Sequence, residues 1–237
     1  MAEFAKRLRE NYLAVEDRIA RACQRAGRER SEVTLVAVTK YANWEWVQAL
    51  VQLGQVNLGE NRTQQLLERA TQLTQPASWH LIGHLQSNKA RSLVKRIPWI
   101  HSIDSLKLLQ LIDRLASEHQ WWPHVLLEVN VTGEPTKHGW TPDELRSDWE
   151  AIQDCRKVDL RGLMTMAPAS DDPETARPGF QALRKLRDEL QSRSLDGQHA
   201  IPDLSMGMTG DFEVAIAEGA TFVRIGSALF EGLEENV

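Results

Sequence analysis

The amino-acid sequence predicts an α/β protein that folds as a single (β/α)8 TIM barrel with an extra N-terminal helix. The chain has 237 residues, close to the roughly 250 that such a barrel typically needs. Short apolar segments alternate with longer polar, helix-forming segments along the whole chain. Strands that alternate with helices favour a parallel sheet with right-handed crossovers, and eight such units close into a barrel.

The first predicted element is an amphipathic helix that ends near Gly27. Its apolar face is formed by Phe4, Leu8, Val15, Ile19 and Cys23. The next segment, Val33–Lys40, is an almost continuous apolar and β-branched run, which is typical of a strand buried on both faces. The other predicted strands are Val56–Asn61, Trp79–Gln86, Trp99–Asp104, Val125–Val131, Leu160–Pro168, Leu204–Met208 and Phe222–Phe230.

Polar segments with helix-forming composition separate these strands. The predicted helices include Glu45 to about Gly54, Ser105–His119, Thr141–Cys155, Thr175–Ser194 and Asp211–Glu218. A doubly wound open sheet is the alternative, but no GxGxxG motif follows the first strand. No Pro/Gly/Ser-rich linker interrupts the chain, so we expect one domain, residues 1–237.

Composition narrows the class of function. The net charge of −5 does not favour nucleic acid or an anionic membrane as a partner. No signal peptide and no run of 18 apolar residues is present, so we expect a cytoplasmic protein. Cys23 and Cys155 lack the spacing of a metal site and are expected to be reduced, so no metal is predicted.

Polar residues gather where chemistry is expected in such a barrel. Functional residues of (β/α)8 barrels lie at the C-terminal ends of the strands, and phosphate usually binds after strands seven and eight. The predicted strand ends offer Lys40, Asn61, His80, His84, Thr165, Met166, Ser205–Thr209 and Arg224–Ser227. These groups should converge at one end of the barrel.

Lys40 is the most informative of them. A lysine that closes a buried apolar strand is desolvated as an ammonium ion, so its pKa should fall. A neutral amine is what imine formation with an aldehyde requires. In the alternative interpretation, the aliphatic stem of Lys40 simply carries the charge to solvent.

The last two strand ends suggest a phosphate site. Small residues in SMGMTGD, which begins Ser205-Met206-Gly207, let backbone N–H groups approach an anion, as do Gly226 and Ser227. Each segment alone could be an ordinary turn. Together with an aldehyde-reactive lysine, they point to pyridoxal 5′-phosphate (PLP).

Arg224 is the remaining candidate in the site. Its side chain could reach the pyridine nitrogen of the cofactor. Because a guanidinium only donates hydrogen bonds, it would keep that nitrogen unprotonated. The alternative is a salt bridge to a strand carboxylate such as Glu60.

Five segments carry a family resemblance. They are Thr39-Lys40, Gly59–Arg62 (GENR), Trp79–Lys89 (WHLIGHLQSNK), Lys137–Gly139 (KHG) and Leu204–Phe230. With these motifs the chain resembles the pyridoxal phosphate homeostasis proteins, from the first strand to the last. The resemblance implies a barrel of the alanine-racemase N-terminal-domain type.

The resemblance also implies roles for individual residues. Lys40 would form the imine, Ser205 with Gly226 and Ser227 would hold the phosphate, and Arg224 would face the ring nitrogen. Asn61 and His80 match positions that line the pocket. The family is thought to buffer PLP or deliver it, with PLP-dependent apo-enzymes as possible partners. Thr209 stands where serine is common and keeps a hydroxyl.

A racemase or decarboxylase on the same barrel is the alternative. Racemases that resemble this barrel have a second domain and a tyrosine base from a partner subunit. Here the sequence stops soon after the eighth strand and contains only Tyr12 and Tyr41. Racemisation needs an acid/base group on each face of the substrate, and only Lys40 is visible. We therefore expect a monomeric, non-catalytic carrier, with a signalling module that uses bound PLP as a third hypothesis.

Overall fold

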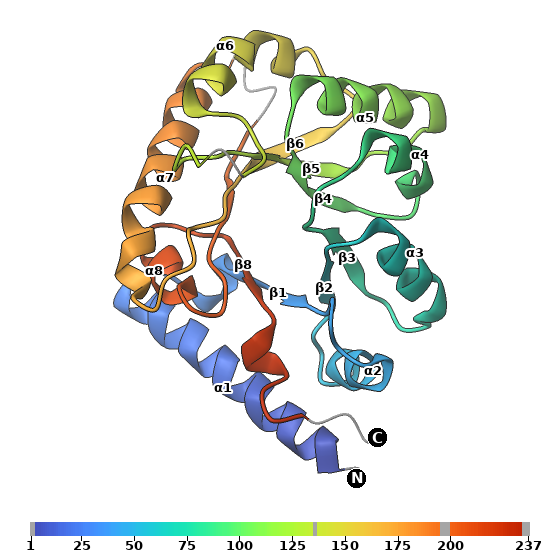
Figure 1. The fold of residues 1–237 in the computed structure, drawn as a ribbon, viewed down its shortest axis with the longest axis vertical. Coiled ribbons are helices and arrows are strands. Elements are labelled where there is room, and N and C mark those ends of the chain that lie inside the picture. The colour runs from blue at the N-terminus through green and yellow to red at the C-terminus, as the bar shows by residue number, and fades with distance from the viewer. Residues whose placement is uncertain (1–2, 135–136, 195–199, 234–237) are drawn as a thin grey trace.

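The computed structural model describes residues 3–134, 137–194 and 200–233. Eight parallel strands form a closed barrel in chain order, because β1 (Thr34–Val38) pairs with both β2 (Asn57–Glu60) and β8 (Phe222–Ile225). Helices surround the strands on the outside (Figure 1). The predicted (β/α)8 barrel is therefore confirmed.

The remaining strands follow in sequence order between β2 and β8. They are β3 (Ser78–Leu81), β4 (Trp99–Ile103), β5 (His124–Glu128), β6 (Asp159–Met164) and β7 (Asp203–Ser205). Several are shorter at their C-terminal ends than the sequence predicted. Strand β1 stops at Val38 rather than Lys40, and residues 227–229 form a short 3-10 helix instead of extending β8. Lys40 and Asn61 therefore belong to loops, whereas His80, Ser205 and Arg224 lie within strands.

The helices are α1 (Glu3–Arg25), α2 (Trp44–Gln52), α3 (Thr63–Gln72), α4 (Ala90–Leu93), α5 (Leu106–His119), α6 (Pro142–Gln153), α7 (Arg177–Ser192) and α8 (Phe212–Ala217). The helices whose bounds the sequence predicted, α1, α2 and α5 to α8, lie close to their predicted positions. Ser105 caps α5 by accepting from the backbone N–H of Leu108. Thr141 and Glu144 form a capping box at the start of α6, with Pro142 in the first turn.

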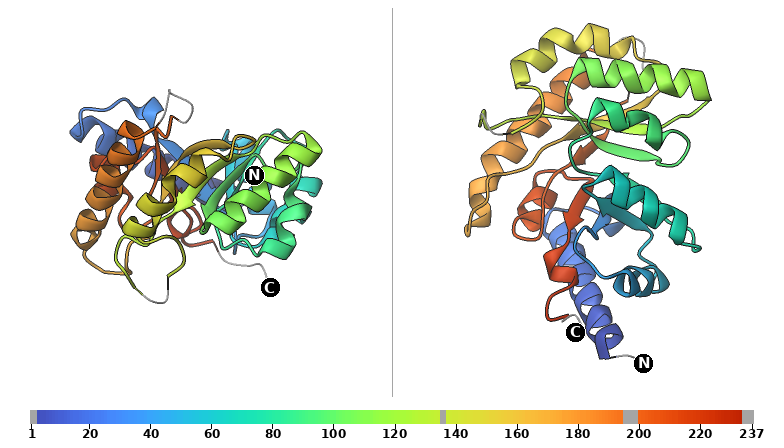
Figure 2. Two further views of the ribbon diagram at one scale, coloured as in Figure 1. Left: turned by 90° about the horizontal axis from the view of Figure 1, so that it is seen from above. Right: turned by 45° about the vertical axis from the view of Figure 1, so that its right-hand side comes forward.

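The extra helix α1 completes the outer ring. It packs against α8 and α2, and the views in Figures 1 and 2 show it running alongside α8. Its residues Leu8, Val15 and Ile19 are buried, as their spacing predicted. Arg18 and Arg25 reach across to Glu213 of α8 at 2.9 and 2.7 Å. Helix α1 thus covers the seam at which β8 meets β1.

The apolar core lies largely between the barrel and its helices. Trp149, Phe180 and Phe212 are among its largest fully buried side chains, and they come from α6, α7 and α8. The described residues contain no helix that is both long enough and apolar enough to cross a membrane. The barrel interior, by contrast, contains several buried polar side chains, which belong to the site described next.

Candidate functional site

A cavity of about 460 Å³ opens at the C-terminal end of the barrel. This volume lies within the range of about 300–1,000 Å³ that is common for small-molecule sites. Its walls come from the loops that follow β1, β2, β3, β6, β7 and β8. The lining residues are Val38, Lys40, Tyr41, Ala42, Asn61, Ile82, Met166, Met208, Thr209, Gly210, Arg224, Gly226, Ser227 and Phe230.

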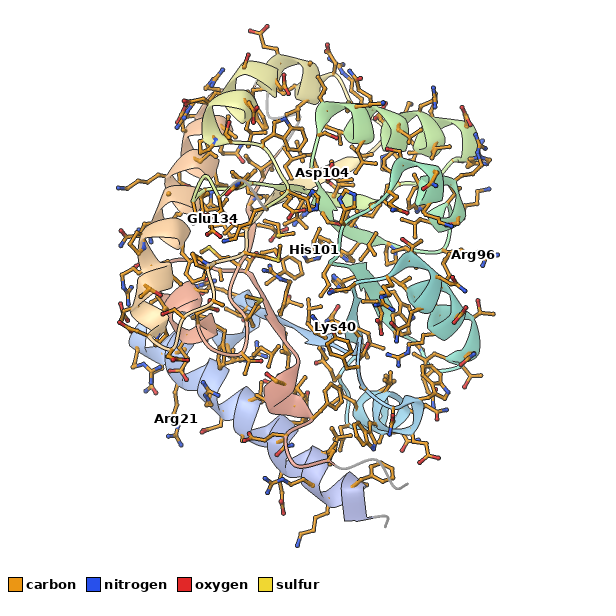
Figure 3. The ribbon with its side chains drawn as sticks, viewed as in Figure 1. Arg21, Lys40, Arg96, His101, Asp104 and Glu134 are labelled. Carbon is orange, nitrogen blue, oxygen red and sulfur yellow. The ribbon has the colours of Figure 1, made fainter. Side chains whose placement is uncertain are left out.

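Five of the nine predicted site residues line this cavity. They are Lys40, Asn61, Arg224, Gly226 and Ser227. The other four are buried elsewhere: His80, Ser205, Met206 and Gly207. Figure 3 shows Lys40 and His101 toward the middle of the barrel, whereas Arg21 of α1 and Arg96 in the turn after α4 lie on the outside.

Lys40 lies in a turn that Arg69 of α3 holds in place. One guanidinium nitrogen of Arg69 donates to the carbonyl oxygen of Thr39 and the other to that of Ala42, both at 2.6 Å. Arg69 also donates to Glu60 at 2.6 Å, and the Thr39 hydroxyl donates to the same carboxylate oxygen at 2.5 Å. The sequence offered Glu60 as a partner for Arg224, but its partner in the structure is Arg69.

The side chain of Lys40 is partly buried at the cavity wall. Its Nζ atom lies 5.1 Å from the centre of the Tyr41 ring, a distance at which an ammonium is attracted to the ring face. Tyr41 itself is 83% exposed, so its hydroxyl is not enclosed in the cavity. The amine of Lys40 and the ring of Tyr41 therefore occupy the same side of the cavity.

Arg224 reaches the cavity from β8 with only 4% of its surface exposed. Its guanidinium donates to the hydroxyl of Ser205 at 2.6 Å and to the carbonyl of Thr165 at 2.9 Å. Burial lowers the pKa of Arg224 to about 10, although the Asp211 and Glu128 carboxylates act in the opposite direction. The side chain thus stays charged at neutral pH in a fixed orientation.

A chain of hydrogen bonds continues from Arg224 into the barrel interior. The amide oxygen of Asn57 can only accept, so Nε2 of His80 donates to it at 3.2 Å. Nδ1 of His80 then accepts from Nε2 of His101 at 3.0 Å, and Nδ1 of His101 accepts from the Ser205 hydroxyl at 2.9 Å. Ser205 in turn accepts from Arg224. Each bond fixes the direction of the next.

Both imidazoles in this chain are neutral. Burial, with a smaller contribution from His124, lowers the pKa of His80 to about 3. Burial also holds the pKa of His101 well below its usual value, as do His80 and Arg224. Neutral rings are what the alternation of donor and acceptor nitrogens requires.

Four of the predicted site residues do not line the cavity. Ser205 does not line the cavity, since its hydroxyl is used by His101 and Arg224. His80 lies beneath the cavity, and Met206 belongs to the apolar core. Gly207 has φ +92°, and a Cβ there would lie 2.5 Å from Cβ of Ala215 in α8. Glycine at this position therefore allows close packing.

Free backbone donors adjoin the cavity after β7 and β8. In the ranges that the structure describes, the backbone N–H groups of Thr209, Gly210 and Ser227 have no hydrogen-bond acceptor. The loop after β7 is shaped by Asp211, whose carboxylate accepts from the N–H of Met208 at 2.6 Å. Thr209 and Gly210 line the cavity, whereas Ser205–Gly207, a few residues earlier in the same SMGMTGD motif, do not.

Sequence reasoning missed most of the apolar wall. Val38, Ile82 and Phe230 were assigned to strands without a role in the site, although each lies at the end of a strand or within five residues of it. Met166 and Met208 were noted only as residues of strand-end segments. Their common signal is an apolar residue at or just beyond the end of a strand.

The chain was compared with known families and relatives. The profile of the family described as alanine racemase, N-terminal domain, matches residues 11–234. The pyridoxal phosphate homeostasis protein of Aquifex aeolicus is 42% identical over 222 residues, which are 93% of this chain and 96% of that protein. The chain belongs to the pyridoxal phosphate homeostasis protein family.

Solved structures agree with this membership. PipY of Synechococcus elongatus, with PLP bound, is 36% identical and has a TM-score of 0.80, covering 91% of this chain and 99% of that one. An alanine racemase of Clostridium difficile shares the fold with a TM-score of 0.72. It is only 17% identical, and this chain covers 58% of that one. The family thus shares its barrel with a larger enzyme.

Proposed function

We propose that this protein binds PLP as an imine on Lys40 and serves intracellular PLP homeostasis by buffering or delivering the cofactor. The observation that carries the proposal is the cavity that Lys40 shares with Arg224 and with free backbone donors after β7 and β8. PLP combines an aldehyde, a basic ring nitrogen and a phosphate. The structure of the relative PipY with PLP bound supports the same ligand.

Each part of the cavity suits one part of PLP. The N–H groups of Thr209, Gly210 and Ser227 can donate to phosphate oxygens, and Gly226 lines the cavity beside Ser227. The Lys40 amine supplies the nucleophile for the aldehyde. Arg224, held by Ser205 and Thr165, can only donate and so would leave the ring nitrogen unprotonated.

The cavity suits a carrier better than a racemase. Among the described residues that line it, the ionisable side chains are Lys40, Tyr41 and Arg224. Tyr41 lies on the same side as Lys40, so no second acid or base faces the lysine. An unprotonated pyridine ring is also a weak electron sink. The protein therefore holds PLP without turnover.

The proposal includes the cellular setting. Cys23 and Cys155 are both free and buried, which suits a reducing cytoplasm. PLP-dependent apo-enzymes are the proposed recipients, and a single barrel acts as a monomer.

Deuterium exchange distinguishes a carrier from an enzyme. PLP-loaded protein would be incubated with alanine, lysine and other L-amino acids in deuterated water, and the α-proton signal followed by NMR. We expect no exchange beyond that of an equal concentration of free PLP, and we expect apo-enzymes to regain activity when mixed with the loaded protein. Faster exchange of any amino acid would establish an enzyme instead.

A further inference from the structure

Three potential metal ligands meet at the barrel end that carries the cofactor cavity, but outside that cavity. His84 follows β3, Asp104 follows β4 and His138 lies in the loop after β5. Their ligand atoms all lie within 4.8 Å of one another. Nδ1 of His84 is 2.9 Å from Oδ2 of Asp104, and the His84 and His138 rings stack with centres 4.3 Å apart.

A second carboxylate lies beside this cluster. Glu128, the last residue of β5, is only 4% exposed, and no hydrogen bond to its carboxylate is found among the residues described. The loop that carries His138 is pressed against it: Gly139 has φ +100°, and a Cβ there would lie 3.1 Å from Cγ of Glu128. The Glu128 side chain is largely buried, and a nearby cation would stabilise its carboxylate.

We propose that His84, Asp104 and His138 form a binding site for a divalent transition metal ion, with Zn²⁺ as the best match. Two imidazoles and a carboxylate are ligands that Zn²⁺ favours, and three protein ligands leave a position for water. Glu128 adds negative charge beside the ion. The site does not depend on the proposed binding of PLP.

The geometry permits such a site with small side-chain movements. Zn–N and Zn–O bonds of about 2.0–2.2 Å place tetrahedral ligand atoms roughly 3.3 Å apart, so the outermost atoms must move by about an ångström. His84 and His138 are exposed and their rings can rotate. A second cavity, of about 390 Å³, has Asp104, Gly139 and Trp140 in its wall.

The structure also contains a matched control. His124 contacts Asp159 at 2.6 Å, so it forms a histidine–carboxylate pair like His84 and Asp104. No third ligand accompanies this pair in the described part of the chain. If a histidine–carboxylate pair alone bound metal, both places would bind it.

The test is a metal titration of the full-length protein after dialysis against a chelator. Zn²⁺ would be followed by calorimetry, and Co²⁺ by the visible absorption bands of tetrahedral coordination. We expect one equivalent to bind. His84→Ala and His138→Ala should each weaken binding by about 100-fold or more, because loss of a direct ligand exceeds loss of an outer one. His124→Ala should bind as tightly as the unchanged protein.

Bound PLP could itself chelate metal, so the titration is repeated with Lys40→Ala protein, which should keep the Zn²⁺ affinity. His138 lies in an exposed loop, so His138→Ala should fold even where another variant does not. The absence of a saturable equivalent, or a Zn²⁺ affinity in either the His84→Ala or the His138→Ala protein equal to that of the unchanged protein, would overturn the proposal. Loss of the site in Lys40→Ala protein would overturn it as well, by assigning the metal to the cofactor.

Discussion

Ser205 and Ser227 come from neighbouring strand ends, yet their hydroxyl groups have different surroundings. Ser227 lines the cavity, and neither its hydroxyl nor its backbone N–H has a hydrogen-bond partner in the described ranges. Ser205 is fully buried and connects His101 to Arg224. We therefore infer that Ser227 contacts the phosphate, whereas Ser205 acts by positioning Arg224.

This difference predicts that Ser227→Ala affects only the ligand that carries a phosphate, whereas Ser205→Ala affects both ligands. Ser227→Ala should weaken PLP binding by about tenfold, the worth of a hydrogen bond to a charged group, and leave binding of pyridoxal, which lacks phosphate, unchanged. Ser205→Ala should weaken PLP and pyridoxal alike. Dissociation constants from absorbance titration provide the measurement. Equal loss of pyridoxal affinity in both variants would contradict the assignment.

Arg224 gives a separate prediction through its charge. If its guanidinium faces the ring nitrogen, Arg224→Gln should alter the absorption spectrum of the bound cofactor, since the hydrogen bond to that nitrogen changes. Ser205→Ala should shift the spectrum in the same direction but less, because Thr165 still holds the guanidinium. A spectrum unchanged in Arg224→Gln protein would place the arginine away from the ring.

The sequence located Lys40, Asn61, Arg224, Gly226 and Ser227 because strand ends in a barrel converge. It could not separate them from residues such as Ser205, since a strand end has no marker of depth. Whether a side chain points into the cavity or below it depends on where each strand stops. That position is fixed by neighbouring strands and loops rather than by local composition.

At the scale of elements, α3 determines the position of the lysine turn. Arg69 of α3 bonds to the carbonyls of Thr39 and Ala42 and to Glu60 at the end of β2. Both charges are largely buried, with side-chain exposure of 12% for Arg69 and 0% for Glu60. Removing one partner would leave the other uncompensated in the interior.

Arg69→Met should therefore lower the free energy of unfolding by about 3–5 kcal/mol, the cost of an unpaired buried charge. Glu60→Gln in the same chain should restore part of it, because the remaining buried group is then neutral. Urea denaturation of the two single variants and the double variant measures this coupling. Additive losses would show that the pair does not act as a unit.

The predicted strands were too long for a related reason. Apolar residues continue past the last hydrogen-bonded residue into the site, as Met166 and Phe230 do. Composition cannot distinguish an apolar residue of a strand from one of a cavity wall. Helix starts were easier to predict than strand ends, because Ser105 and Thr141 are N-cap residues directly before α5 and α6.

At the scale of the whole molecule, the hydrogen-bond chain from Asn57 to Arg224 spans the barrel interior. Its two histidines make the free energy of unfolding depend on pH. Burial lowers the pKa values of His80 and His101 in the folded state, so both rings stay neutral there as pH falls below about 6.5. In the unfolded state the same rings become protonated in that range. The free energy of unfolding should therefore fall with decreasing pH, from about 6.5 toward about 3 for His80.

Each histidine contributes a slope of about 1.4 kcal/mol per pH unit in that window. His80→Gln removes one of the two titrating rings, so its slope between pH 5 and pH 4 should be lower than that of the unchanged protein by about that amount. Urea unfolding at each pH provides the values. Parallel curves for the two proteins would show that His80 is protonated in the folded state.

The proposed attachment of PLP to Lys40 can be measured by borohydride reduction followed by peptide mass mapping. We expect a visible absorption band that disappears on reduction, with the pyridoxyl phosphate mass on the peptide that contains Lys40. The adduct should be absent from Lys40→Ala protein and unchanged in Lys107→Ala protein, which lacks a surface lysine of α5. An adduct that persists in Lys40→Ala protein, or no band after PLP is added, would contradict it.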